Sequence, residues 1–455
     1  MSHTNPVAGT PSTAPRRNTH FRYTIMSLIV LMTMINYIDR GAISYASEPI
    51  IRLFHLNESS WGEVLGYFGY GYMVGSISGG LLSDKKGPKF VWIVAGSLWS
   101  IFEILMAFAG NIGIAIFGGS ALAGFAVIRI LFGVSEGPLF STMNKTVANW
   151  AANREKGFMQ SFGLFGVPFG SLITAPIAVG LLSITNWQTT FVLLGSLGVI
   201  WVIVWARVFR NRPEEHTRVS RDELLEIRSG QGVLSSENTL TESEQQEIPW
   251  YHFFKNPTLV CNAIGYFAFQ YVNFLILTWT PKYLQDTFHY SLSKMWYMGM
   301  IPWIGACITV MLGGKISDVL RRRTGNLRIA RSGLAVLSLV LTAVCFLLIP
   351  TVHSIASVLL LMSIGNAFNF LPNSVYWAVV IDTEPSKAGS FGGVTHFITN
   401  IATVMAPTLT GFLVSAHGYH AMFIASAVAS VIGMVAMMFV KPGKRVQSVI
   451  GNLEK

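Results

Sequence analysis

Charged residues are scarce in this chain of 455 residues. Asp, Glu, Lys and Arg make up 12% of it, about half of the roughly 25% that is usual in soluble globular domains. Apolar residues make up 51%. Soluble domains of this total length would need a charged surface that this composition cannot supply. The composition therefore argues against a water-soluble enzyme and predicts a membrane-embedded protein.

Cysteine is scarce as well. Cys261, Cys307 and Cys345 lie in predicted helices without the close spacing of a metal or redox pair, so we expect buried, inert thiols. The sequence contains no nucleophile motif, metal-ligand cluster or phosphate loop. The prediction is a protein that is not an enzyme and that needs no cofactor or metal.

Long uncharged segments recur at the length that crosses a bilayer, about 20 apolar residues. Seven are clear: 64–83, 189–206, 256–281, 295–314, 333–350, 355–381 and 421–440. Five are weaker or interrupted: 23–43, 90–110, 116–140, 157–183 and 388–414. The predicted fold class is therefore an all-α membrane protein with twelve transmembrane helices.

The net charge of +10 follows from membrane topology. Twelve spans put both termini on one side, together with almost all basic residues. Arg52, Lys282 and Lys294 fall on the other side, and Arg40 and Arg129 fall within the membrane. Because basic residues concentrate on the cytoplasmic side, we expect both termini there. Basic residues interleaved with aromatics are absent, so nucleic acid is not an expected partner.

A long polar segment divides the predicted helices into two groups of six. We expect a linker over 211–256, in which 222–228 forms a short helix and the polar C-terminal part is unstructured. It separates helical halves over 23–210 and 257–440, and cytoplasmic tails are expected over 1–22 and 441–455.

The two halves repeat each other in sequence. Gly80-Leu-Leu-Ser-Asp84 recurs as Gly314-Lys-Ile-Ser-Asp318 at an offset of 234, and Ala175-Pro176 recurs as Ala406-Pro407 at an offset of 231. Parallel six-helix halves form one class of secondary transporter, with the substrate site between them near the bilayer midplane.

Three motifs carry a family resemblance. Gly80-Leu-Leu-Ser-Asp84-Lys-Lys-Gly87 resembles the signature between helices two and three of the major facilitator superfamily. Asn36-Tyr-Ile-Asp39-Arg40 and the segment from Arg129 to Phe140 resemble the bacterial branch of the anion:cation symporter family. This branch contains proton-coupled permeases for galactonate, glucarate and hexuronates. The resemblance covers nearly the whole chain and implies a bacterial inner-membrane protein.

Three positions depart from the bacterial sugar-acid permeases. Ser141 stands where these permeases usually carry proline, and Val167 stands where galactonate permeases carry a substrate-facing glutamine. His396 stands where they carry asparagine. The identity of the sugar acid therefore stays open.

Five ionisable residues lie in predicted spans: Asp39, Arg40, Glu103, Arg129 and Glu136. Each costs about 2.5 to 3.5 kcal/mol on insertion scales, so each needs a partner or a function. Asp39 and Arg40 point roughly 100° apart, so they face different partners. Arg129 and Glu136 lie on one helix face about 10 Å apart along the axis.

We hypothesise that Asp39 and Glu136 carry protons, with Arg129 as their alternating partner, as the resemblance implies. The alternative is a static ion pair of Asp39 with Arg129 that holds two helices together. Arg40 offers a planar fork for the substrate anion, or else packs against Asp39 or a backbone carbonyl. For Glu103 we favour a neutral acid hydrogen-bonded between helices over a proton relay.

Polar and aromatic residues complete the predicted substrate site, although each could instead be ordinary core: Tyr37, Tyr72, Ser374, Tyr376, Trp377, His396 and Asn400. Asn369, Pro372 and Asn373 are expected to interrupt the tenth helix. The repeated loop motif comprises Gly80, Asp84, Gly87 and Asp318 and is expected at the cytoplasmic face. Its acids are predicted to cap neighbouring helix N-termini or to pair with basic residues, which would stabilise an outward-facing closure.

The predicted function is import of a small organic anion, a hexonate, hexuronate or aldarate, in symport with protons by a monomer. An exchanger or facilitator for another carboxylate or a sulfonate, without proton coupling, is the alternative. A transporter-like nutrient sensor is a more remote one, since the linker and tails offer no structured signalling domain.

Overall fold

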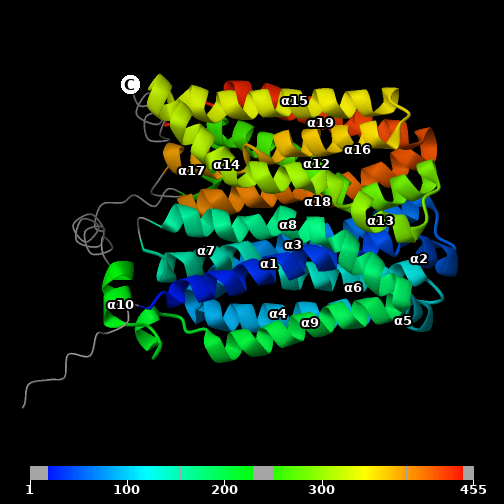
Figure 1. Ribbon diagram of the computed structural model, residues 1–455, viewed down its shortest axis with the longest axis horizontal. Coiled ribbons are helices and arrows are strands. Elements are labelled where there is room, and N and C mark those ends of the chain that lie inside the picture. The colour runs from blue at the N-terminus through cyan, green and yellow to red at the C-terminus, as the bar shows by residue number, and fades with distance from the viewer. Residues whose placement is uncertain (1–18, 153–154, 229–248, 385–387, 444–455) are drawn as a thin grey trace, which may run out of the picture.

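The computed structural model describes residues 19–152, 155–228, 249–384 and 388–443. The long helices run roughly parallel to one another along the longest axis of the molecule (Figure 1). We call the end that carries α10 (Arg221–Arg228) the linker end. We call the other end, which carries α2 (Ser47–Phe54), α5 (Ala109–Ile116) and α13 (Leu292–Met298), the opposite end (Figure 1).

Both halves are helical. The long helices of the first half are α1 (Phe21–Tyr45), α3 (Glu58–Lys86), α4 (Pro88–Met106), α6 (Ala121–Glu136) continued by α7 (Leu139–Trp150), α8 (Lys156–Ile184) and α9 (Trp187–Val208). Those of the second are α12 (Pro257–Phe288), α14 (Ile301–Thr324), α15 (Leu334–Leu348), α16 (Ile355–Phe370) continued by α17 (Asn373–Thr383), α18 (Ala388–His417) and α19 (Tyr419–Phe439).

The expected all-α membrane fold is confirmed. Eleven segments of the described chain are long and apolar enough to cross a membrane. The helix α3 covers the remaining predicted span; it has 29 residues, many of them Gly, Ser and Tyr, which lower its hydropathy. The tenth span is interrupted as predicted, because α16 ends at Phe370 and α17 begins at Asn373 after Pro372.

The first helix begins earlier than predicted. It starts at Phe21, inside the segment 1–22 assigned to a tail, and Arg22 is buried. The Arg22 guanidinium pairs with Glu155 at 3.0 Å and with Glu226 at 2.9 Å. Glu226 lies on α10, the short helix expected at 222–228. Residues 1–18 of the predicted N-terminal tail, residues 229–248 of the linker and residues 444–455 of the predicted C-terminal tail lie outside the described residues.

Glycines let α3 approach two other helices closely. A Cβ on Gly71 would lie 1.8 Å from the carbonyl oxygen of Ile130 on α6. A Cβ on Gly62 would lie 2.7 Å from the carbonyl oxygen of Pro407 on α18. The first contact is within the first half, and the second joins the two halves.

Gly71→Ala is expected to destabilise the protein, because backbone on α6 leaves no room for the methyl group. Overpacking of this kind typically costs about 1 to 3 kcal/mol. Thermal unfolding of the detergent-purified protein measures the effect. Gly393→Ala on α18 is the matched control, since a Cβ there meets nothing within 4 Å. Equal melting temperatures of both variants and the parent would contradict the expectation.

The two halves meet at the opposite end of the molecule. Gly62 and Gly66 near the start of α3 pack on Pro407 and Thr408 in the second part of α18. At the same end the Lys282 ammonium of α12 lies 3.2 Å from the carboxylate of Glu58 on α3. Lys282 also pairs within its own half with Asp286, at 2.8 Å. The molecule is therefore closed at this end.

Glu58→Gln is expected to favour opening of this end, because it removes the charge attraction of the pair between the halves. A change of about 1 to 2 kcal/mol would shift the ratio of open to closed molecules roughly 5-fold to 30-fold. Spin labels at Arg52 and His420, both exposed, report the distance between the halves in a cysteine-free background. Asp286→Asn, which alters the pair within one half, is the control, and equal distributions in both variants would contradict this role.

Candidate functional site

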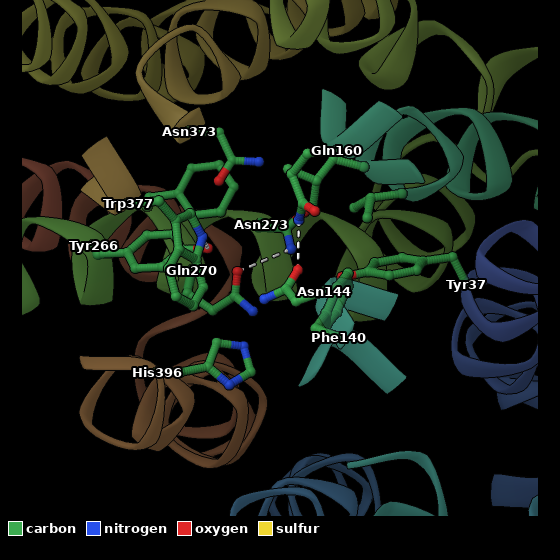
Figure 2. A pocket seen from close by; sticks show the side chains of 13 residues that line it. Tyr37, Phe140, Asn144, Gln160, Tyr266, Gln270, Asn273, Asn373, Trp377 and His396 are labelled. Atoms are coloured by element: carbon green, nitrogen blue, oxygen red, sulfur yellow. Dashed lines mark hydrogen bonds between the residues drawn. The ribbon is translucent and has the colours of Figure 1, made fainter. Parts of the chain in front are cut away.

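A polar cavity lies between the two halves (Figure 2). It is lined by Tyr37, Phe140, Asn144, Gln160, Leu164, Val167, Tyr266, Phe269, Gln270, Asn273, Asn373, Trp377 and His396. They come from α1, α7 and α8 of the first half and from α12, α17 and α18 of the second, with Phe140 and Asn144 both on α7. Asn144 is exposed. None of these lining residues is an Asp, Glu, Lys or Arg. His396 is the one lining residue whose side chain can acquire a positive charge near neutral pH.

Five of the residues that line this cavity carry side-chain amides. Gln160 donates to the Asn144 side chain at 2.6 Å, and Asn273 donates to Gln270 at 3.4 Å (Figure 2). Opposite them, the Trp377 indole donates to the Tyr266 hydroxyl at 3.1 Å. Amides, hydroxyls and aromatic faces together suit a polar, hydroxyl-rich ligand.

Arg40 forms a buried ion pair with Glu136 beside this cavity. Its Nε donates to Oε2 of Glu136 at 2.6 Å, and both side chains are at most 2% exposed. The guanidinium carbon lies 4.9 Å from the centre of the Tyr37 ring and 4.4 Å from that of Tyr72. Tyr37 in turn lines the cavity. Arg40 therefore packs against the cavity wall.

The other two guanidinium nitrogens of Arg40 are buried and make no hydrogen bond of regular geometry, although the guanidinium also interacts with the Tyr72 side chain. A buried donor left without a partner costs about 1 to 3 kcal/mol, and more when it is charged. Such a group is a candidate site for a ligand that supplies the acceptor. A carboxylate fits this geometry, because it can accept two parallel hydrogen bonds from a guanidinium.

Asp39 faces away from Arg40, as the helix geometry predicts. Its Oδ2 accepts from the Trp99 indole of α4 at 2.9 Å, and its Oδ1 is buried without a partner. The described residues contain no ion pair of Asp39 with Arg129, so the static pair considered from the sequence is not present in this structure.

Arg129 binds backbone instead of a carboxylate. Its Nε and Nη2 donate to the carbonyl oxygens of Val64 and Leu65 on α3, each at 3.3 Å. Its guanidinium carbon lies 5.3 Å from the centre of the Phe68 ring, which also contacts Arg40 at 4.8 Å. In this structure Arg40, rather than Arg129, is therefore the ion-pair partner of Glu136.

Glu103 on α4 completes a cluster of five buried ionisable residues with Asp39, Arg40, Arg129 and Glu136. Its buried Oε1 has no hydrogen-bond partner, so the hydrogen bond between helices that the sequence suggested is not made by this oxygen. Glu103 is 1% exposed and interacts electrostatically with Asp39, Glu136 and Arg129. One oxygen on each of the three buried carboxyl groups is thus left without a hydrogen-bond partner. All five ionisable residues singled out from the sequence are buried.

The cavity contains some of the predicted substrate-site residues. Tyr37, Trp377 and His396 line it. Tyr72 lies next to it, with its ring centre 6.2 Å from that of His396, and Asn400 donates to Nδ1 of His396 at 3.1 Å.

Two predicted site residues lie elsewhere. Tyr376 is fully buried and stacks on Tyr266, with ring centres 4.9 Å apart. Ser374 lies against α14, where its Oγ is 3.4 Å from a Cβ built on Gly314. The break at Pro372 turns α17 so that Asn373 and Trp377, one helical turn apart, line the cavity instead.

Several lining residues were not predicted from the sequence: Asn144, Gln160, Tyr266, Phe269, Gln270 and Asn273. A signal for part of this set was available, since Gln270 and Asn273 are polar residues within the uncharged segment 256–281. Amides inside a membrane span need partners or a ligand. Val167, noted for its departure from a substrate-facing glutamine, does line the cavity.

The repeated loop motif lies at the ends of α3 and α14. Gly87 ends α3 with φ of 80°, a left-handed conformation that favours glycine. Asp318 pairs with Arg331 at 3.5 Å, which agrees with the predicted pairing to a basic residue. The Asp84 side chain and the surroundings of Gly80 lie outside what the structure describes.

Known proteins resemble this chain over nearly its full length. A hexuronate transporter of Bacillus subtilis (strain 168) is 31% identical, covering 92% of this chain and 94% of that protein. A probable sulfoacetate transporter of Cupriavidus necator is 30% identical, with the same two coverages. The solved structure of a proton:xylose symporter bound to 6-bromo-6-deoxy-D-glucose superimposes with a TM-score of 0.71 at 16% identity, covering 96% of this chain and 99% of that one.

A family model described as Major Facilitator Superfamily matches residues 29–407, most of both helical halves. Together with the eleven membrane-spanning candidates and the full-length relatives, this match confirms the resemblance of the loop motifs. The chain belongs to the major facilitator superfamily and is a multi-pass membrane transporter.

Proposed function

We propose that this transporter imports a sugar acid across the bacterial inner membrane in symport with protons. The observation that carries the proposal is the buried Arg40 guanidinium, which pairs with Glu136 through Nε and leaves two nitrogens unpartnered beside a polar cavity. These nitrogens would bind the substrate carboxylate, and the amides of the cavity would bind its hydroxyls.

Competition for Arg40 would couple the anion to a proton. When a substrate carboxylate binds the guanidinium, Glu136 loses part of its counter-charge while it stays buried. Proton uptake relieves the cost of that uncompensated negative charge. One oxygen on each of Asp39, Glu103 and Glu136 is free to hold a proton. The cluster has three carboxyl groups for two guanidinium groups, which favours a bound proton even without substrate.

Alternating access would carry the sugar acid and the proton across the membrane. The halves are closed at the opposite end, and Asn144 on the cavity wall is exposed. If the linker end is cytoplasmic, as the basic residues predict, this conformation releases substrate to the cytoplasm. Rocking of the halves about the cavity would open the opposite end.

The relatives support a sugar acid as substrate, since one of them is a hexuronate transporter. Proteoliposome uptake tests the proposal. Inward accumulation of D-glucuronate or D-gluconate is expected when the outside is made acidic, and a protonophore is expected to abolish it. Uptake that does not depend on the pH gradient would identify a facilitator or exchanger. Accumulation of sulfoacetate alone would refute the sugar-acid assignment.

A further inference from the structure

We propose that the site selects acids with a single negative charge and several hydroxyl groups, such as aldonates and uronates, and rejects dianions such as aldarates and sulfoacetate. His396 is the residue that sets this preference, as a neutral hydrogen-bond donor rather than a second cation. The inference rests on the transport function proposed above and specifies the charge of its substrate.

The hydrogen bonds of Asn400 define the state of His396. The amide nitrogen of Asn400 donates to the carbonyl oxygen of His396 at 2.7 Å and faces its Nδ1 at 3.1 Å. Turning the amide over would place its oxygen against that carbonyl oxygen, which is repulsive. The amide nitrogen therefore donates to Nδ1 as well, and Nδ1 must be an acceptor. It follows that His396 is neutral and carries its proton on Nε2.

The His396 ring lies at the boundary between the two halves. Its centre is 6.2 Å from that of Tyr72 and 6.1 Å from that of Phe140, both in the first half. It is 5.8 Å from the Trp377 ring in the second half. Because the ring lines the cavity (Figure 2), its Nε2 proton is a donor for a substrate oxygen.

Among the described residues that line the cavity or contact its wall, Arg40 is the cation available for an anion. The lining residues include no Lys or Arg. Arg40, against Tyr37, has two free nitrogens, whereas Arg129 donates to the carbonyl oxygens of Val64 and Leu65. Once Glu136 takes up a proton, as proposed above, the single guanidinium of Arg40 balances one substrate carboxylate.

The remaining polar groups of the wall match hydroxyls better than a second carboxylate. Gln160, Gln270, Asn273 and Asn373 each present both a donor and an acceptor. A sugar hydroxyl also donates and accepts, so it can satisfy both ends of an amide. A carboxylate only accepts, and in this part of the cavity its charge would have no counter-charge.

Binding to the detergent-purified protein directly tests the proposed preference for monoanions over dianions, which we call the charge rule. Titration calorimetry with D-glucuronate, D-gluconate, D-glucarate and sulfoacetate at neutral pH compares acids of one and two charges. We expect the two monoanions to bind at least tenfold more tightly than the two dianions.

Substitutions of His396 separate a donor from a charge. His396→Lys adds a second cation and is expected to tighten D-glucarate binding at least tenfold. His417→Lys is the matched control, because His417 lies on the same helix at its exposed end. His396→Leu removes the donor and is expected to weaken D-glucuronate binding about tenfold. His396→Asn keeps an N–H donor and should lose less.

The outcomes are distinct from those of the uptake assay. Equal binding of D-glucarate and D-glucuronate to the parent protein, or no binding of either monoanion, overturns the charge rule. An equal gain for D-glucarate in His396→Lys and His417→Lys overturns the role of His396. Selective binding of monoanions without accumulation driven by a pH gradient would support the charge rule and refute the proposed proton symport.

Discussion

Glu136→Gln is expected to abolish accumulation of substrate against a pH gradient. An electroneutral symport of one proton with one monoanion accumulates substrate about tenfold per pH unit, since each step of about 1.4 kcal/mol is tenfold. The amide keeps the size of Glu136 and can still contact Arg40, but it cannot exchange a proton. Uptake by the variant should therefore stop when the inside and outside concentrations are equal. Proteoliposome uptake with an imposed gradient measures this ratio.

Downhill exchange is expected to persist in Glu136→Gln, because exchange needs substrate binding and movement of the halves but no net proton transfer. Glu63→Gln is the control, a carboxyl group of the same type on α3 that is hydrogen-bonded to Tyr67 at 3.1 Å and lies outside the cluster. It should accumulate substrate like the parent. A Glu136→Gln variant that still reaches about tenfold accumulation per pH unit would assign the proton to another group.

Arg40→Ala is expected to weaken binding of the substrate anion at least about 100-fold. Hydrogen bonds to charged groups contribute about 1.5 to 3 kcal/mol each, and the two free nitrogens of Arg40 offer two of them. Arg40→Lys keeps the charge but loses the planar fork, so it should lie between the parent and Arg40→Ala. Titration calorimetry with D-glucuronate measures the three affinities.

Misfolding is the competing explanation for a loss of binding in Arg40→Ala, because that change leaves Glu136 buried without its partner. The double variant Arg40→Ala/Glu136→Gln removes both charges and should recover thermal stability without recovering binding. Arg52→Ala, at a residue whose side chain is 78% exposed, is the control for loss of a positive charge. Full-strength binding by the stable double variant would place the anion site elsewhere.

The sequence predicts the helical architecture well, because membrane insertion is governed by length and apolarity. The twelve spans, the repeat and the break near Pro372 follow from such local properties. It also identifies the five buried ionisable residues, since charge within an apolar segment is unusual whatever the fold.

Pairing among those residues could not be predicted. Whether Arg40 on α1 meets Glu136 on α6 depends on the rotation and tilt of the two helices, which are set by packing such as the contact of Gly71 with Ile130. For the same reason, the sequence predicted only some of the residues that line the cavity. Ser374 and Trp377 lie on one short helix, yet only Trp377 lines the cavity.

The cluster around Arg22 determines where this chain can be divided into fragments. Thr19 donates to Glu223 of α10 at 2.6 Å, and Arg22 pairs with Glu155 and with both Glu223 and Glu226. A pair of co-expressed fragments divided after Arg228 keeps every one of these contacts. Division before α10 would place Glu223 and Glu226 on the second fragment, so that only Glu155 of these three partners would remain on the same fragment as Arg22. The first folding unit of the transporter therefore extends through α10.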